Sequence, residues 1–337
     1  MIRRWRSRAI VAAVLATFTL ADATPASAYL KYGVSVGGRT IALKWASTPV
    51  RYYVNDRGGA GISATDLQVT AGRAFASWQA VPDASIRYQF AGYTTALPGQ
   101  DDGISVLGFL NRPELTRVLA STSYVIDDST GELIESDIFF NAAFAWSMSA
   151  AGEAGKFDLE SIALHEIGHL SGLGHSALGE TEPRPEGGRR VVAAEAIMFP
   201  IAFAAGNVSG RSLRADDIAG ISDLYPGGDF TDTGSISGRV TKNGQGVFGA
   251  HVIAFDLAHG DLVANFALSR DGAFVIAGLS PGAHVVRVEP IDDADVSSFF
   301  DASRPIDIDF RVAFSEQVIV VPKHGDSGAV EVKVVPK

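Results

Sequence analysis

Hydrophobic residues recur at helical spacing in three stretches of the chain. In residues 62–81 they follow Ser63, which suits an N-cap, and lie three or four positions apart: Leu67, Ala71, Ala74, Phe75 and Trp78. Residues 159–172 form a second such stretch, and Asp158 is its candidate N-cap. Residues 215–225 form a third, with two aspartates in its first turn, beside the positive end of the helix dipole. We therefore predict three amphipathic helices.

Shorter runs rich in β-branched and aromatic residues lie between these helices. They predict strands within residues 45–55, 104–109, 116–126 and 132–141, separated by Gly and Asp turn signals. Residues 176–190 lack periodicity and are rich in Gly, Pro and charge, so we predict a surface loop there. Helices and strands together predict an α+β domain.

The pattern changes at Gly234, where apolar runs of strand length recur every eight to twelve residues. Their number and spacing predict a β-sandwich, formed by residues 235–240, 249–256, 262–269, 272–279, 283–290, 316–322 and 329–335. The sequence Pro226-Gly227-Gly228 stops the preceding helix. We therefore predict a linker at 227–233 and an all-β domain at 234–337.

Composition narrows the possible functions. With 337 residues the chain can form two domains, and 47% hydrophobic with 20% charged residues is typical of globular proteins. The net charge of −10, without a Lys/Arg cluster beyond the first eight residues, argues against a nucleic-acid partner. The chain has no cysteine, which excludes disulfides and cysteine-ligated metals.

The N-terminus has the pattern of an export signal. Four arginines precede an apolar stretch of about 13 residues, and Ala26-Ser27-Ala28 is a small-residue cleavage site. The alternative is an uncleaved membrane anchor, but a bilayer span needs about 20 apolar residues. We predict a signal peptide at 1–28, a first domain at 29–226 and a secreted protein with no membrane association after cleavage.

The sequence HEIGHLSGLGH, residues 165–175, concentrates three of the seven histidines of the chain. His165 and His169 are four residues apart, so on a helix both imidazoles project from one face. Gly172 can end the helix in a left-handed conformation and let the chain bring back His175 as a third ligand. Three nitrogens leave one position open, as in catalytic zinc sites. Zinc in such a site acidifies water, and Glu166 is placed to take the proton.

The same stretch resembles the metzincin zinc peptidases, and specifically the matrixins. The resemblance extends to AEAIMFP at 194–200, which is similar to the methionine turn of the family, to the helix at 213–226, and to the segments WASTPVRYYVN and SWQAV. It implies a matrixin catalytic domain over residues 40–226, with a twisted, mixed but mostly parallel sheet, three helices and one catalytic zinc in a cleft.

The resemblance also implies roles for individual residues. His165, His169 and His175 would bind the zinc, and Glu166 would be the general base. Met198 would lie beneath the zinc without binding it. Substrate would contact Leu119 and Ala120 in a cleft-edge strand, and Pro200 and Ile201 in the wall of the pocket beyond the scissile bond. Since no histidine precedes His165, the second, structural zinc of animal matrixins is not expected.

Calcium sites are common in this family. Acidic side chains that could supply oxygens are Asp127, Asp128, Glu132, Glu135 and Asp137. A solvated turn is the alternative interpretation, because calcium needs six or more convergent oxygens.

The C-terminal segment resembles the carboxypeptidase regulatory-like, transthyretin-like β-sandwich. Its Asp-Gly-x-Phe and Leu-x-Pro-Gly signals carry the similarity, and no catalytic constellation accompanies them. The resemblance implies a spacer, or a domain that binds a surface or the substrate.

Together these observations predict a secreted, monomeric zinc metalloendopeptidase that acts on proteins or peptides. One alternative is a non-catalytic adhesion or binding protein with a structural zinc, and another is hydrolysis of a different amide bond by the same site. Glu166 separates the first alternative from an enzyme, because a structural zinc has no need of a base.

Overall fold

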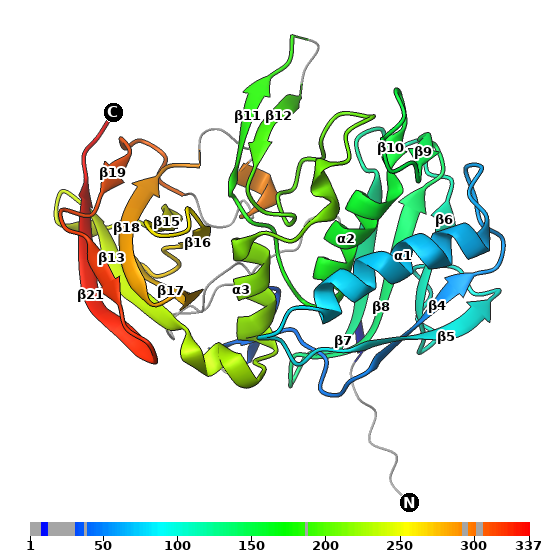
Figure 1. The fold of residues 1–337 in the computed structure, drawn as a ribbon, viewed down its shortest axis with the longest axis horizontal. Helices are drawn as coiled ribbons and strands as arrows, with labels where there is room; N and C mark the ends of the chain where they lie inside the picture. Colours follow the sequence, from blue (N-terminus) through cyan, green and yellow to red (C-terminus); the bar gives the residue numbers. More distant parts are fainter. Residues whose placement is uncertain (1–7, 13–30, 37–38, 186–187, 292–295, 301–305) are drawn as a thin grey trace, which may run out of the picture.

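The computed structural model describes residues 8–12, 31–36, 39–185, 188–291, 296–300 and 306–337. Figure 1 shows a region of mixed helices and strands on the right and a β region on the left, with helix α3 between them. No helix in these residues is long and apolar enough to cross a membrane.

A six-stranded sheet forms the base of the first region. Its order is β1(Arg8–Ala12), β7(Ala120–Asp127), β8(Glu132–Asn141), β6(Ser105–Leu110), β4(Val50–Asn55) and β5(Tyr88–Thr94). Strands β8, β6, β4 and β5 are parallel, and β7 runs antiparallel to β8. The sheet is mixed and mostly parallel, as expected.

Strand β1 falls inside the predicted export signal and pairs antiparallel with Ser123–Asp127 of β7. The remaining residues of that signal lie outside the described part of the chain, and cleavage after Ala28 stays a prediction. Short strands complete the region: β2(Gly33–Val36) with β3(Arg39–Ala42), and β9(Trp146–Ser147) with β10(Phe157–Asp158).

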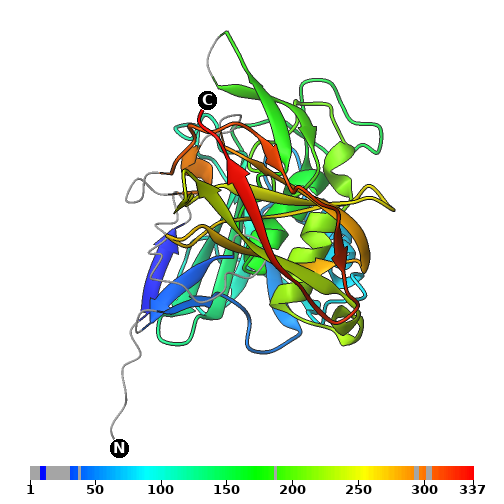
Figure 2. The ribbon, with the colours of Figure 1, turned by 90° about the vertical axis from the view of Figure 1, so that its left-hand side faces the viewer.

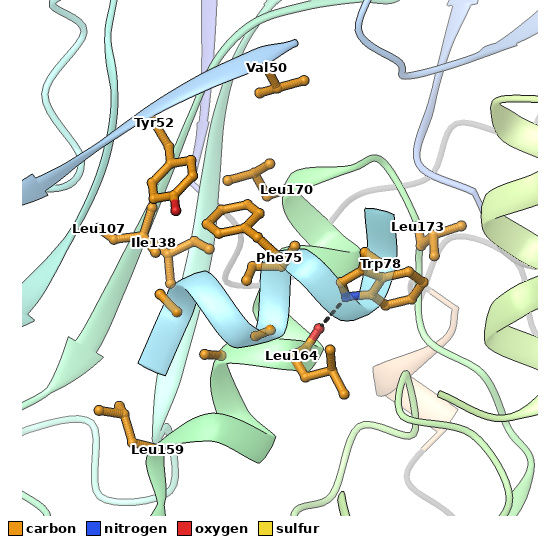
Figure 3. Packing of buried hydrophobic residues seen from close by; sticks show 14 of the residues in the cluster. Val50, Tyr52, Phe75, Trp78, Leu107, Ile138, Leu159, Leu164, Leu170 and Leu173 are labelled. Carbon is orange, nitrogen blue, oxygen red and sulfur yellow. Dashed lines mark hydrogen bonds between the residues drawn. The ribbon is translucent and has the colours of Figure 1, made fainter. Parts of the chain in front are cut away.

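The first two helices pack on each other and on the sheet. Helix α1(Ala64–Gln79) starts where predicted, because the Ser63 hydroxyl accepts the Asp66 N–H at 3.1 Å. Its apolar residues are buried against β4 and β5, and the Trp78 indole donates to the Leu164 carbonyl of α2(Leu159–Leu170) at 2.9 Å. Figure 3 shows this bond within the surrounding core. The bond fixes α1 against the helix that carries the histidines.

Residues 176–190 do not form the loop that we predicted. Strand β11(Gly179–Pro183) pairs antiparallel with β12(Arg189–Ala194), and the hairpin projects from the molecule in Figure 1. Its residues are mostly exposed or half-buried, and Glu182 forms an ion pair with Arg190 across the strands. A hairpin held by polar cross-strand pairs has no alternation of apolar residues, which explains the wrong prediction.

Helix α3(Ala215–Leu224) confirms the third predicted helix, and short 3-10 turns lie at η1(Ser209–Arg211), η2(Gly228–Asp232) and η3(Val296–Ser298). Ala219 of α3 belongs to the buried cluster of the β region. The predicted linker contains η2, and the Gly227 N–H donates to the Asp83 carbonyl at 2.6 Å. The predicted linker is therefore packed against the first region.

The C-terminal β region consists of two sheets. One contains β14(Gln245–Gly246), β13(Gly234–Lys242), β17(Ala273–Leu279) and β21(Gly325–Val334). The other contains β16(Leu262–Phe266), β15(His251–Asp256), β18(Gly282–Glu289), β19(Ala313–Phe314) and β20(Ile319–Val321). Figure 2 shows β21 and β13 facing the viewer. Buried residues of both sheets form one apolar cluster, which is consistent with the predicted sandwich, and every predicted run overlaps a strand.

Candidate metal centre

The second helix places two histidines side by side. Its N-terminus is capped by Asp158, whose carboxylate accepts the Ser161 N–H at 3.0 Å and the Arg211 Nε–H at 2.9 Å. The rings of His165 and His169 lie 4.7 Å apart between centroids. The four-residue spacing therefore has the expected effect of bringing both imidazoles to one face.

A glycine after the helix returns the chain toward this face. Gly172 has a φ of +100°, and a Cβ there would lie 2.3 Å from the Leu43 carbonyl oxygen, so no other residue fits. The turn brings the His175 ring to 4.8 Å from that of His169 and 5.5 Å from that of His165. Potential ligand atoms of the three histidines all lie within 4.8 Å of one another.

The outer nitrogen of each ring is held by a backbone carbonyl. Nδ1 of His165 lies 2.7 Å from the Ile197 oxygen, and Nδ1 of His169 lies 2.8 Å from the Leu173 oxygen. Nδ1 of His175 lies 2.9 Å from the Ser298 oxygen. Because a carbonyl only accepts, each Nδ1 carries the proton and each Nε2 presents a lone pair.

These lone pairs fit a metal ion. Nε2 of His169 lies 3.2 Å from Nε2 of His175, close to the separation of about 3.3 Å that two ligands at 2.0–2.1 Å from a tetrahedral zinc require. Burial lowers the pKa of His165 to about 3 and the pKa of His169 well below its ordinary value, so the rings are neutral. Two facing lone pairs repel unless a cation lies between them. The donor set therefore suits zinc.

The glutamate between the first two histidines is buried, with 5% of its surface exposed. Its Oε2 accepts the Thr122 hydroxyl of β7 at 2.6 Å. Burial raises the pKa of Glu166 to about 7, and the hydrogen bond from Thr122 opposes this shift. A buried carboxylate fixed by one hydrogen bond and next in sequence to His165 is a candidate proton acceptor, and this role stays a prediction.

Met198 lies directly against the histidine helix. It is 3% exposed, and a Cβ on Gly168 would lie 2.2 Å from its sulfur and 2.9 Å from the Trp78 ring. The Met198 carbonyl accepts the Ser176 N–H at 2.9 Å, next to His175. Since Gly168 precedes His169, the methionine packs under the turn that carries the second histidine.

Sequence patterns did not indicate the role of Asp217. We expected this side chain to interact with the helix dipole, yet it is 2% exposed and accepts N–H groups from Ile197 at 2.8 Å, Met198 at 3.1 Å and Arg214 at 2.9 Å. Ile197 in turn holds His165. The only signal in the sequence was an acidic pair in the first turn, which helices commonly carry for other reasons.

The region that holds these histidines is similar to known proteins. Residues 44–182 match the matrixin family. Metalloendoproteinase 5-MMP of Arabidopsis thaliana is 44% identical over 77 residues, which is 23% of this chain and 17% of that protein. Matrix metalloproteinase-20 of Homo sapiens is 35% identical over 95 residues, which is 28% of this chain and 16% of that protein. The chain therefore covers about a sixth of the length of these relatives.

The residues that match the matrixins contain all three histidines and Glu166, whereas Met198 and α3 follow the matched residues. Of the residues predicted to bind substrate, Ala120 begins β7, and the Leu119 carbonyl accepts the Asn141 N–H at 2.8 Å. Pro200 and Ile201 lie just beyond Met198 and are half-buried. Substrate binding by these four residues stays a prediction.

In the described part of the chain, the acidic residues proposed for calcium do not form a group of three potential ligands. Glu135 accepts the Asp102 N–H at 3.2 Å, and Asp137 accepts N–H groups from Gly99 and Val106, each at 2.6 Å. Among the described residues, none of the five belongs to a group of three potential metal ligands within 4.8 Å. These carboxylates bind backbone amides, and calcium binding stays a prediction.

Tyr32 packs against the ring of the second histidine, His169. The Tyr32 ring lies 5.5 Å from that of His169 and 5.4 Å from that of Tyr124. The Tyr32 N–H donates to the Gly172 carbonyl at 3.1 Å, and the Tyr124 hydroxyl donates to the His169 carbonyl at 3.0 Å. The end of α2 is therefore held from two sides, by Tyr32 and by Tyr124 of β7.

Proposed function

We propose that this protein is a secreted zinc metalloendopeptidase that hydrolyses peptide bonds in proteins. The observation that supports the proposal is that potential ligand atoms of three histidines lie within 4.8 Å of one another, next in sequence to the buried Glu166 and within residues that match the matrixins. His165, His169 and His175 would hold a zinc ion, which would supply a Lewis acid that polarises a peptide carbonyl and acidifies water.

The protein side chains perform the proton transfers. Glu166 accepts a proton from the attacking water and donates it to the leaving amine. The Thr122 hydroxyl, 2.6 Å from Oε2, orients the carboxylate for both steps. Met198 forms an apolar floor, and Asp217 holds the backbone that fixes His165.

Substrate would bind in an extended conformation along the start of β7. Leu119 and Ala120 lie where β7 begins, and main-chain hydrogen bonds to such an edge are independent of substrate sequence. Pro200 and Ile201 would line the pocket beyond the scissile bond. We further propose one catalytic zinc, export by the N-terminal signal, a monomeric state and a C-terminal carboxypeptidase regulatory-like sandwich.

The experiment that tests the proposal is the substitution Glu166→Gln, with cleavage of casein or gelatin and the zinc content measured on the same samples. We expect cleavage to fall by about 10²- to 10⁴-fold with zinc retained, because only the general base is lost. Glu160→Gln is the matched control, since Glu160 lies on the same helix and pairs with Arg73 at 2.8 Å. Equal cleavage by Glu166→Gln and wild type would overturn the proposal, and bound zinc without any cleavage by wild type would favour a binding protein.

A further inference from the structure

The backbone carbonyl that hydrogen-bonds to His175 comes from a different region of the chain than the carbonyls that hydrogen-bond to His165 and His169. His165 and His169 are held by carbonyls of Ile197 and Leu173, which lie in the first region. His175 is held by the carbonyl of Ser298, 123 residues further along the chain in the C-terminal region. One ligand of the candidate metal centre therefore depends on the other half of the molecule.

The segment that supplies this carbonyl forms a hydrogen-bonded turn. Ser298 is the last residue of η3, and the N–H groups of Phe299 and Phe300 both donate to the Val296 carbonyl, at 3.0 and 2.9 Å. These bonds close a local turn and fix the direction of the Ser298 carbonyl.

An aromatic side chain of the same segment contacts the histidine ring. Phe299 is 2% exposed, and its ring lies edge-on to that of His175, with 6.3 Å between centroids. Phe299 also belongs to a buried cluster with Phe266, Phe300 and Ala177, and Ala177 follows His175 by two residues. The cluster therefore joins the segment to the turn that carries the third histidine.

A buried carboxylate forms a second connection near this turn. Asp216 of α3 is 2% exposed and accepts the Ala264 N–H of β16 at 2.8 Å. The side chain of Ser176, next to His175, also hydrogen-bonds to Asp216. A cavity beside His175 is lined from both regions, by Asp216 and Ser176 on one side and Phe266 on the other.

We propose that Ser298 and Phe299 are positioning residues of the metal centre, so that the C-terminal region is a structural part of the zinc site. The Ser298 carbonyl holds the proton of His175 on Nδ1 and leaves Nε2 for the metal, while Phe299 prevents rotation of the ring. The inference rests on the proposed function, because it takes zinc as the ion that the histidines bind.

The first test measures zinc affinity of the full chain by competition with a chromophoric chelator, in a Glu166→Gln background that prevents self-cleavage. We expect Phe299→Ala to weaken zinc binding by about tenfold or more, as partners of metal-bound histidines typically contribute 10- to 100-fold. Phe300→Ala is the matched control, because its ring lies in the same cluster but contacts Phe248 and Phe266. We expect the zinc affinity of Phe300→Ala to stay within about twofold of the affinity of the Glu166→Gln parent.

The second test needs no variant in the segment. In the metal-free Glu166→Gln protein, long-range ¹H–¹⁵N spectra of His175 should show the tautomer protonated on Nδ1. A tautomer protonated on Nε2 would overturn the inference even if Phe299→Ala failed to fold. A parent that binds no zinc would refute the proposed function, whereas tight zinc binding by the parent and equally by Phe299→Ala would refute only the role of the segment.

Discussion

Two groups of three side chains in the described part of the chain bring potential metal ligands within 4.8 Å of one another, and their surroundings differ. The histidine group lies on α2 and on the turn after it, and 6% of the surface of His169 is exposed. The other group, Asp256, His259 and Asp261, lies on the turn between β15 and β16, where the His259 side chain is 64% exposed.

The groups also differ in what occupies their polar atoms. In the histidine group every Nδ1 bonds to a backbone carbonyl, so three lone pairs remain for an ion. In the turn, Nδ1 of His259 bonds to Asp256 at 2.7 Å, and the other oxygen of Asp256 accepts the Ala258 N–H at 2.8 Å. Three potential ligands close to one another are therefore not enough for a metal site. The site also needs hydrogen-bond partners that leave the donor atoms free for the ion.

Loss of zinc from the histidine group is the largest expected effect that tests the difference between the two groups. His169→Ala removes one of three ligands, and we expect the zinc affinity to fall by more than about 100-fold, since indirect partners alone contribute 10- to 100-fold. His259→Ala should bind one zinc as tightly as wild type. The measurement is the metal-to-protein ratio with a titration of affinity, and a lower ratio in His259→Ala would break the comparison.

A smaller effect concerns the packing that holds the histidine helix. A Cβ on Gly168 would overlap the Met198 sulfur at 2.2 Å, so we expect Gly168→Ala to lower the free energy of unfolding by about 1 to 3 kcal/mol. Gly72→Ala on α1 is the control, because the nearest atom would be the Gln68 side-chain nitrogen at 3.7 Å. It should raise the free energy of unfolding by about 0.5 to 1 kcal/mol. Denaturant unfolding of both variants checks the prediction, and equal effects would contradict it.

The smallest effect is a pH dependence in the exposed turn. Hydrogen bonding to Asp256 raises the pKa of His259 above its ordinary value, and the charges of Asp256 and Asp261 add to this. The pair therefore contributes stability that is fully present below the unfolded pKa of His259 and is lost as the pH rises through its folded value. NMR titration should show the His259 pKa falling toward about 6.5 in Asp256→Asn.

Asp261→Asn supplies the matched control for this titration, since its charge makes a smaller contribution and the His259 pKa should fall less. Addition of one equivalent of zinc should leave the His259 signal unchanged while it shifts those of His165, His169 and His175. A zinc-dependent shift of His259 at that ratio would remove the distinction between the two groups.

Local sequence patterns predicted the parts of the molecule that depend on local geometry. The caps Ser63 and Asp158, the left-handed Gly172 after the end of α2 and the approach of His165 to His169 all follow from contacts a few residues apart. Each of these features has a residue type that marks it, which is why the sequence reveals it.

Features that depend on distant partners could not be predicted. The hairpin of β11 and β12 is held by polar pairs such as Glu182 with Arg190, which also occur in loops. Asp217 contacts the backbone near Met198 only because α3 packs there. The Ser298 carbonyl has no sequence signature, since every residue has one, and it meets His175 from 123 residues away.

The position of Tyr32 has a consequence for maturation of the polypeptide. Tyr32 packs on His169, and Lys31 forms an ion pair with Asp223 of α3. A processing protease that stopped after Ala28 would leave both contacts in place, but trimming four residues further would remove them. If the predicted signal is cleaved, a product trimmed beyond Tyr32 would lose the packing against His169 on α2 and the ion pair with α3.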